Sequence, residues 1–88
     1  MPSNSLNTLS EVRVLLGRAL QLGTRADTLS ADSPLLGALP ELDSMAVVSI
    51  LTALEEHYGF TIDDDEIGAD TFATLGSLAE FVAGKLSL

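Results

Sequence analysis

The chain contains no cysteine, so it can form no disulfide, no thiolate nucleophile and no cysteine-based metal site. Basic residues are also scarce: four lysines and arginines stand against thirteen aspartates and glutamates, which gives a formal charge of −9. Such a polyanion repels nucleic acid and anionic lipid, so we expect no nucleic-acid partner. The charge favours protein partners with basic patches, although acidity that serves only solubility would look the same.

Long apolar runs are missing as well. No stretch approaches the length of a membrane-spanning helix, and no basic segment followed by an apolar run opens the chain. We therefore expect a cytoplasmic monomer without membrane insertion. Aromatic residues make up only 5% of the sequence while apolar residues make up 47%, so the expected core consists of Leu, Val, Ile and Ala. This composition excludes a disordered chain.

The length of 88 residues and the hydrophobic periodicity predict a single domain of the all-α class, with three main helices and one short helix. We expect residues 1–4 to be a flexible tail and residues 5–86 to be ordered. The first helix should begin at Ser5 or Thr8 and stop at Gly23. The last should be capped by Thr74, with Lys85 placed favourably for the helix dipole. A one-turn helix is expected over residues 69–72.

Residues 23–42 contain two glycines and two prolines, which predict a long loop. This segment is too apolar for a free linker. We expect its leucines to pin it onto the bundle: Leu29, Leu35, Leu36, Leu39 and Leu42.

The second helix is expected from Asp43 or Ser44 to Tyr58, with Asp43 as N-cap and Gly59 at its end. A rotation of 100° per residue divides it into two faces. The predicted core stripe consists of Val47, Ile50, Leu51, Leu54 and Tyr58. The opposite face carries Met45, Val48, Ser49, Thr52 and Glu56, and is more apolar near the helix start than solvent contact alone requires.

The segment Asp43-Ser44-Met45 opens this helix, which closes with Leu-Glu-Glu at residues 54–56. A Gly-Phe-x-Ile-x-Asp connection follows at residues 59–63, and a Thr-Leu pair opens the last helix. In motif order and spacing, from about Leu9 to Leu86, the chain resembles the acyl carrier protein family. The resemblance implies a small helical bundle of the acyl-carrier type.

The resemblance also implies a site and a set of partners. Ser44, with Asp43 beside it as the helix cap, would carry 4'-phosphopantetheine transferred from coenzyme A by a phosphopantetheinyl transferase. The arm's thiol would carry acyl groups as thioesters, so the chain itself would be a non-catalytic carrier. Acyl-loading, condensing and acyl-transferring enzymes with basic patches would be its clients. The expected docking residues are Met45, Val48, Ser49, Thr52, Glu55 and Glu56.

Two positions depart from the family's pattern. Carriers of fatty acid synthesis usually place acidic residues two and five positions after the modified serine, where this chain has Ala46 and Ser49. The departure favours a dedicated pathway, namely polyketide or lipopeptide-like biosynthesis or a specialised gene cluster, over housekeeping fatty acid synthesis. The run from Pro34 to Met45 also resembles carriers that accompany bacterial exopolysaccharide and protein-sorting clusters.

The same residues suggest other interpretations. A Ser44–His57 hydrolytic pair fails because thirteen residues of helix separate them by roughly 20 Å, while a general base must lie within about 3 Å. An EF-hand starting at Asp63 would have Ile67 and Thr74 where calcium ligands are needed. An unmodified acidic adaptor, or a carrier of amino acids or aryl acids, remains open.

Overall fold

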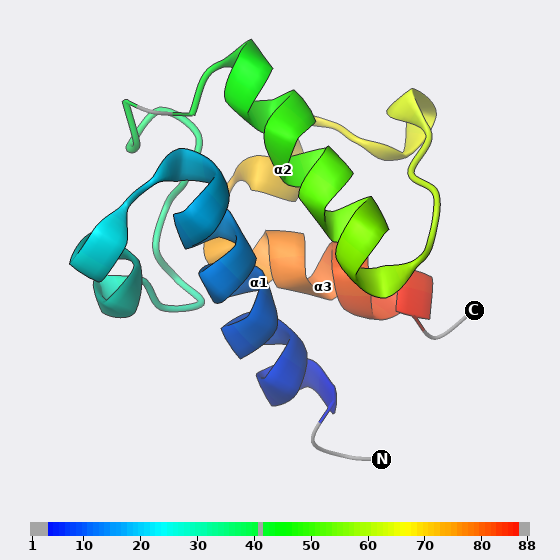
Figure 1. Cartoon of the computed structure of the whole chain (residues 1–88), viewed down its shortest axis with the longest axis horizontal. Coiled ribbons are helices and arrows are strands. Elements are labelled where there is room, and N and C mark those ends of the chain that lie inside the picture. Colours follow the sequence, from blue (N-terminus) through cyan, green and yellow to red (C-terminus); the bar gives the residue numbers. More distant parts are fainter. Residues whose placement is uncertain (1–3, 41, 87–88) are drawn as a thin grey trace.

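The computed structural model describes residues 4–40 and 42–86, and three α-helices organise it. These are α1 (Asn4–Leu20), α2 (Ser44–Tyr58) and α3 (Leu75–Leu86). α1 packs against both other helices, and Figure 1 shows α3 crossing behind α1 and α2. No β-strand occurs among the described residues. The expected all-α class with three main helices is confirmed.

Three short 3-10 helices lie in the connections. They are η1 (Gly23–Thr28), η2 (Asp64–Glu66) and η3 (Ala69–Phe72). Only η3 was expected. The η1 segment was predicted as part of the long loop, and η2 lies in a polar acidic run without a hydrophobic period. Of the predicted tail at residues 1–4, residues 1–3 lie outside the described part, whereas Asn4 is already helical, so the tail was predicted one residue too long at that end. No helix in the described part is long and apolar enough to cross a bilayer.

The end of α1 differs from the expected stop at Gly23. The helix ends at Leu20, and Gln21 takes the left-handed conformation with φ of 55°. The Leu22 N–H then donates to the Gly17 carbonyl at 2.9 Å, which closes a Schellman-type turn. A side chain in this conformation costs about 1–2 kcal/mol. Burial of Leu22, which is 4% exposed, offsets that cost.

Both ends of α2 are as predicted. The Asp43 carboxylate accepts a hydrogen bond from the Ala46 N–H at 2.8 Å, and this satisfies a donor of the first turn. Gly59 ends the helix with φ of 75°, a conformation open to glycine at little cost, and donates to the Glu55 carbonyl.

The core is aliphatic, as the composition predicts, and it draws on all three helices. Its fully buried side chains are Val12, Leu16, Leu35, Ile50, Leu54, Leu75, Leu78 and Val82. Of the five loop leucines, Leu35 and Leu42 are buried, and Leu29 and Leu39 pack partly against the core. Leu36 contradicts the expectation, because it is 49% exposed. Its N–H is bound to the Phe72 carbonyl, so the backbone is pinned there while the side chain points outward.

Backbone hydrogen bonds tie the long connection to the start of α3. The Leu75 N–H donates to the Ser33 carbonyl at 3.0 Å, and the Gly76 N–H donates to the Ala31 carbonyl at 2.8 Å. A Cβ at position 76 would lie only 2.8 Å from the Ala31 oxygen, so this approach requires glycine. The connection is therefore held at a defined position before it leads into α2.

The two ends of α3 are each fixed by side chains. Thr74 and Ser77 exchange backbone-to-hydroxyl hydrogen bonds of 3.0 Å, so the predicted Thr74 cap is confirmed. At the other end, Lys85 does more than suit the helix dipole. Its Nζ lies 2.8 Å from the Glu66 carboxylate and 5.7 Å from the centre of the Phe60 ring. These contacts hold the α2–α3 connection against α3.

Candidate functional site

Ser44 is the first residue of α2, and Figure 1 shows the start of that helix at the top of the view. It is exposed, and within the described residues its hydroxyl has no hydrogen-bond partner. Asp43 bonds the Ala46 N–H through its side chain and the Val47 N–H through its carbonyl. The cap thus fixes the backbone on which Ser44 sits and leaves the hydroxyl free for another molecule to reach.

The first turn of α2 also suits a negatively charged substituent. The N–H groups of Ser44 and Met45 find no acceptor in the described part of the chain. Such groups and the positive end of the helix dipole stabilise a phosphate without any basic residue. A phosphodiester on the Ser44 oxygen therefore fits the residues present.

The outward face of α2 begins beside Ser44. Met45 is 77% exposed and Val48 is 61% exposed, and Ser49, Thr52 and Glu56 are exposed as well. Ile50 and Leu54 point into the core. The helical phase expected for these residues is confirmed. Two large apolar side chains in water next to an exposed hydroxyl form a surface that a partner protein can cover.

Glu55 differs from the other expected docking residues. It is partly buried, and its Oε2 accepts a hydrogen bond of 2.8 Å from the Ile62 N–H. Its carboxylate therefore anchors the chain after α2 and is less open to a partner than that of Glu56. The sequence did not indicate this role, because Ile62 reaches Glu55 only through the turn at Gly59.

Ala46 also differs from expectation. It was placed outside the core stripe, yet it is partly buried and packs against the core. Position 46 is therefore less suited than position 49 to an added carboxylate. A small residue here lets the first turn of α2 lie close to the core.

His57 lies at the far end of α2 from Ser44, on an exposed position. Its ring meets the Tyr58 ring edge-on, with 4.6 Å between centroids. The Tyr58 hydroxyl donates to the Glu11 carboxylate at 2.7 Å, and burial of the hydroxyl together with this bond raises the pKa of Tyr58. These contacts join α2 to α1 and place no base near Ser44. No group of three potential metal ligands occurs among the described residues.

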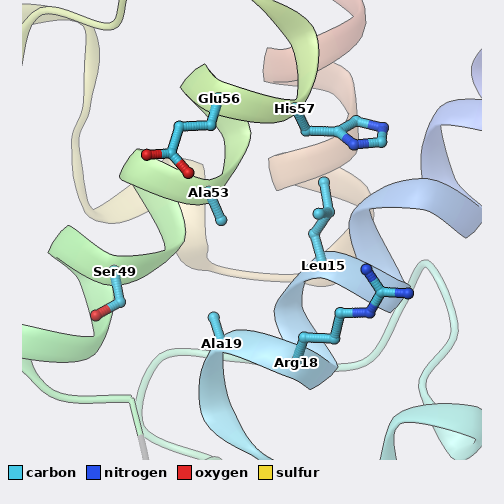
Figure 2. A pocket seen from close by; sticks show the side chains of 7 residues that line it. All are labelled: Leu15, Arg18, Ala19, Ser49, Ala53, Glu56 and His57. Carbon is cyan, nitrogen blue, oxygen red and sulfur yellow. The ribbon is translucent and has the colours of Figure 1, made fainter.

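Sequence reasoning missed a groove between α1 and α2, shown in Figure 2. Its volume is about 440 Å³, and it is formed where Leu15, Arg18 and Ala19 face Ser49, Ala53, Glu56 and His57. No signal within either helix alone could have revealed it, because each contributes only one wall.

Charge is unevenly distributed along the chain. The first forty residues balance three arginines against three carboxylates: Glu11, Asp27 and Asp32. The remaining residues hold the other ten carboxylates, with Lys85 as their only lysine or arginine. The negative charge thus belongs to the part of the chain that begins just before Ser44 and includes α2.

Comparison with known proteins points in the same direction. Residues 10–82 match the family described as phosphopantetheine attachment site. No curated protein matches the chain. Among solved structures, the chain is similar to a holo acyl carrier protein from Nitrosomonas europaea determined by solution NMR. The two are 62% identical with a TM-score of 0.85, over 91% of this chain and 96% of the other.

The structure and the two matches support the same assignment. Ser44 is an exposed serine at the start of α2, and an apolar and acidic face lies beside it. The chain belongs to the acyl carrier protein family, whose covalently attached cofactor is 4'-phosphopantetheine.

Proposed function

We propose that Ser44 is the attachment point and that the chain is a non-catalytic carrier, which passes acyl thioesters between enzymes. The observation that carries the assignment is the exposed, unpartnered hydroxyl of Ser44 at the first position of α2, next to the Asp43 cap. Ser49, another exposed serine of α2, lies beyond the first turn, where the backbone N–H groups are already used within the helix.

The chain's own residues have a limited part in the chemistry. In the attachment step, the Ser44 oxygen bonds to the pyrophosphate phosphorus of coenzyme A that carries the pantetheine. The P–O bond between that phosphorus and the rest of the pyrophosphate breaks, 3',5'-ADP leaves, and the serine proton passes to the transferase. The N–H groups of Ser44 and Met45 stabilise the resulting phosphodiester. When bound, the arm supplies the thiol that this cysteine-free chain lacks.

We further propose that the face formed by Met45, Val48, Ser49, Thr52 and Glu56 docks the clients. Its two apolar side chains provide area to bury, and Glu56 faces water, where it can meet a basic residue. Glu55 contributes mainly by holding the backbone at Ile62. The phosphopantetheinyl transferase and acyl-loading, condensing and acyl-transferring enzymes with basic patches are the proposed partners.

The pathway that we favour is a specialised one. Ala46 and Ser49 stand where the resemblance leads one to expect acidic residues, so an enzyme of housekeeping fatty acid synthesis would lose at least the contact at the exposed position 49. Polyketide or similar dedicated biosynthesis fits this surface better, as does a carrier attached to an exopolysaccharide or protein-sorting cluster. We infer that the carrier works as a single-domain cytoplasmic monomer.

Incubation with coenzyme A and a broad-specificity phosphopantetheinyl transferase tests the assignment. Mass spectrometry should show one added phosphopantetheine, and a thiol reagent should then label one group per chain. Ser44→Ala should gain neither, while the matched variant Ser49→Ala should gain both. Attachment at Ser49 or Ser33 would overturn the site, and no attachment at all would favour the unmodified adaptor.

A further inference from the structure

Arg18 is a cation without a counter-ion among the residues that the structure describes, in a chain that is acidic overall. It is exposed on the last turn of α1, and no described carboxylate pairs with it. Its place near the helix C-terminus suits the dipole, but that interaction uses only the charge. A guanidinium also presents a planar set of donors that matches a carboxylate with two hydrogen bonds. That set of donors is unused within the described part of the chain.

The groove gives Arg18 an apolar setting. Figure 2 shows its guanidinium and the His57 ring on one side of the view, with Leu15 between α1 and α2 and the Glu56 carboxylate on the other side. A second hollow of about 270 Å³ shares Leu15, Arg18 and His57 and extends along α1 past Val14, which is 48% exposed. Apolar walls around a donor group are typical of sites that hold an amphipathic ligand.

The groove adjoins the docking face of α2. Ser49 and Glu56 line the groove and also belong to the exposed face that carries Met45 and Val48. A protein that covers that face therefore reaches Arg18 across the groove. The same partner would then contact both the acidic residues of the docking face and Arg18.

We propose that this groove is an extension of the client-docking surface, occupied by an amphipathic segment of the client enzyme whose carboxylate pairs with Arg18. The inference rests on the proposed carrier function. Leu15, Ala19 and Ala53 provide the apolar wall for such a segment, and charge complementarity selects its carboxylate. A doubly charged phosphate fits less well than a singly charged carboxylate, because Glu56 and Glu11 line the same hollows and repel the larger charge more strongly.

The consequence is a specificity rule. A client must present basic residues to the acidic part of the carrier and one acidic residue to Arg18. An enzyme with a uniformly basic patch would place like charge against Arg18, which disfavours it.

Two synthetic peptides test the groove by NMR with the isotope-labelled phosphopantetheinylated protein. Both are short, end-capped and amphipathic, built from Leu and Ala with either Glu or Lys as the polar residue. The Glu peptide should shift the signals of Leu15, Arg18, Ala53 and His57 at low salt. The Lys peptide, although favoured by the net charge, should shift other residues.

Matched variants separate local from global charge. Arg18→Gln should weaken binding of the Glu peptide about tenfold, whereas Arg18→Lys should lose less. Thr24→Glu changes the net charge by the same amount as Arg18→Gln, on an exposed position of η1 outside the groove, and should leave binding nearly unchanged. Unaltered circular dichroism and melting would show that the variants fold.

The inference is overturned if the Glu peptide shifts no groove signal, if both peptides occupy the groove equally, or if Arg18→Gln binds as the wild type does. Modification of Ser44 is measured separately on the same variants. If Arg18→Gln is still phosphopantetheinylated while the groove binds nothing, the carrier function stands and only the groove fails.

Discussion

At the scale of single residues, neighbours in the sequence have separate tasks. Asp43 contributes structure, because its carboxylate holds the Ala46 N–H, whereas Ser44 contributes a hydroxyl to solvent. Glu55 and Glu56 also have separate roles. The Glu55 carboxylate binds the Ile62 N–H, whereas Glu56 is exposed to water. A motif that names both members of a pair therefore does not say which one a partner touches.

Asp43→Ala should lower the free energy of unfolding by about 1 kcal/mol, because the Ala46 N–H loses its acceptor. Asp43→Asn keeps an oxygen acceptor and should lose only a fraction of that. Urea unfolding of the unmodified protein measures both. Equal stability of Asp43→Ala and wild type would show that the cap contributes nothing.

Glu66 makes the free energy of unfolding depend on pH in the acidic range. The Asp63 N–H and then the Lys85 ammonium hold the pKa of Glu66 below its ordinary value. A lowered folded pKa means that the unfolded chain binds the proton more tightly. The contribution is thus complete above the ordinary glutamate pKa of about 4.3 and is lost as the pH falls through the folded value.

Glu66→Gln should therefore unfold at a lower urea concentration than wild type at neutral pH, and the two midpoints should converge as the pH falls below about 4. Glu80→Gln serves as the control, because Glu80 is an exposed carboxylate of α3, whereas the Lys85 ammonium binds Glu66. A constant gap between Glu66→Gln and wild type at all pH values would rule out this role for Glu66.

At the scale of elements, α2 has two faces with different purposes. Leu54 is fully buried, and Met45 is 77% exposed. The face of Leu54 packs into the core, and the face of Met45 is exposed to solvent beside Ser44. The buried face and the docking face can therefore be altered independently.

Leu54→Ala should lower the free energy of unfolding by about 2–5 kcal/mol, because it leaves a cavity in the core. Met45→Glu should change it by less than about 0.5 kcal/mol and yet slow acyl transfer to client enzymes, because it removes exposed apolar surface. Thermal melts and transfer rates separate the two effects. If Met45→Glu destabilises the protein as much as Leu54→Ala, the docking role of that face is wrong.

At the scale of the whole molecule, the charge is polarised. The first forty residues are balanced, and the rest of the chain carries the full net charge of −9. Long-range attraction to a basic enzyme therefore acts mainly on the part that contains α2, and this orients the carrier before contact. Ser49 belongs to this acidic part and also lines the groove.

Ser49→Glu should raise acyl transfer by enzymes of housekeeping fatty acid synthesis by about two- to fivefold at low salt, because it restores one exposed ion pair. The gain should fade as salt rises. Thr24→Glu adds the same charge on η1 and should gain nothing. This single change is cleaner than one that includes Ala46→Asp, since Ala46 packs against the core. A wild type that already matches a housekeeping carrier would argue against a specialised pathway.

The sequence by itself determined what depends on nearby residues. The bounds of α2, its Asp43 and Gly59 caps, the exposure of Ser44 and the two-sided helix follow from short-range hydrogen bonds and from a helical period that one segment contains. The family resemblance rests on the same local motifs.

Tertiary structure decided what depends on residues far apart in the chain. Leu36 faces water because the backbone around it is pinned to the turn before α3, and Lys85 pairs with Glu66 because the α2–α3 connection folds back onto α3. The groove with Arg18 and His57 exists only where α1 meets α2. Such contacts join segments whose separation along the chain carries no periodic signal, so only the folded packing brings them together.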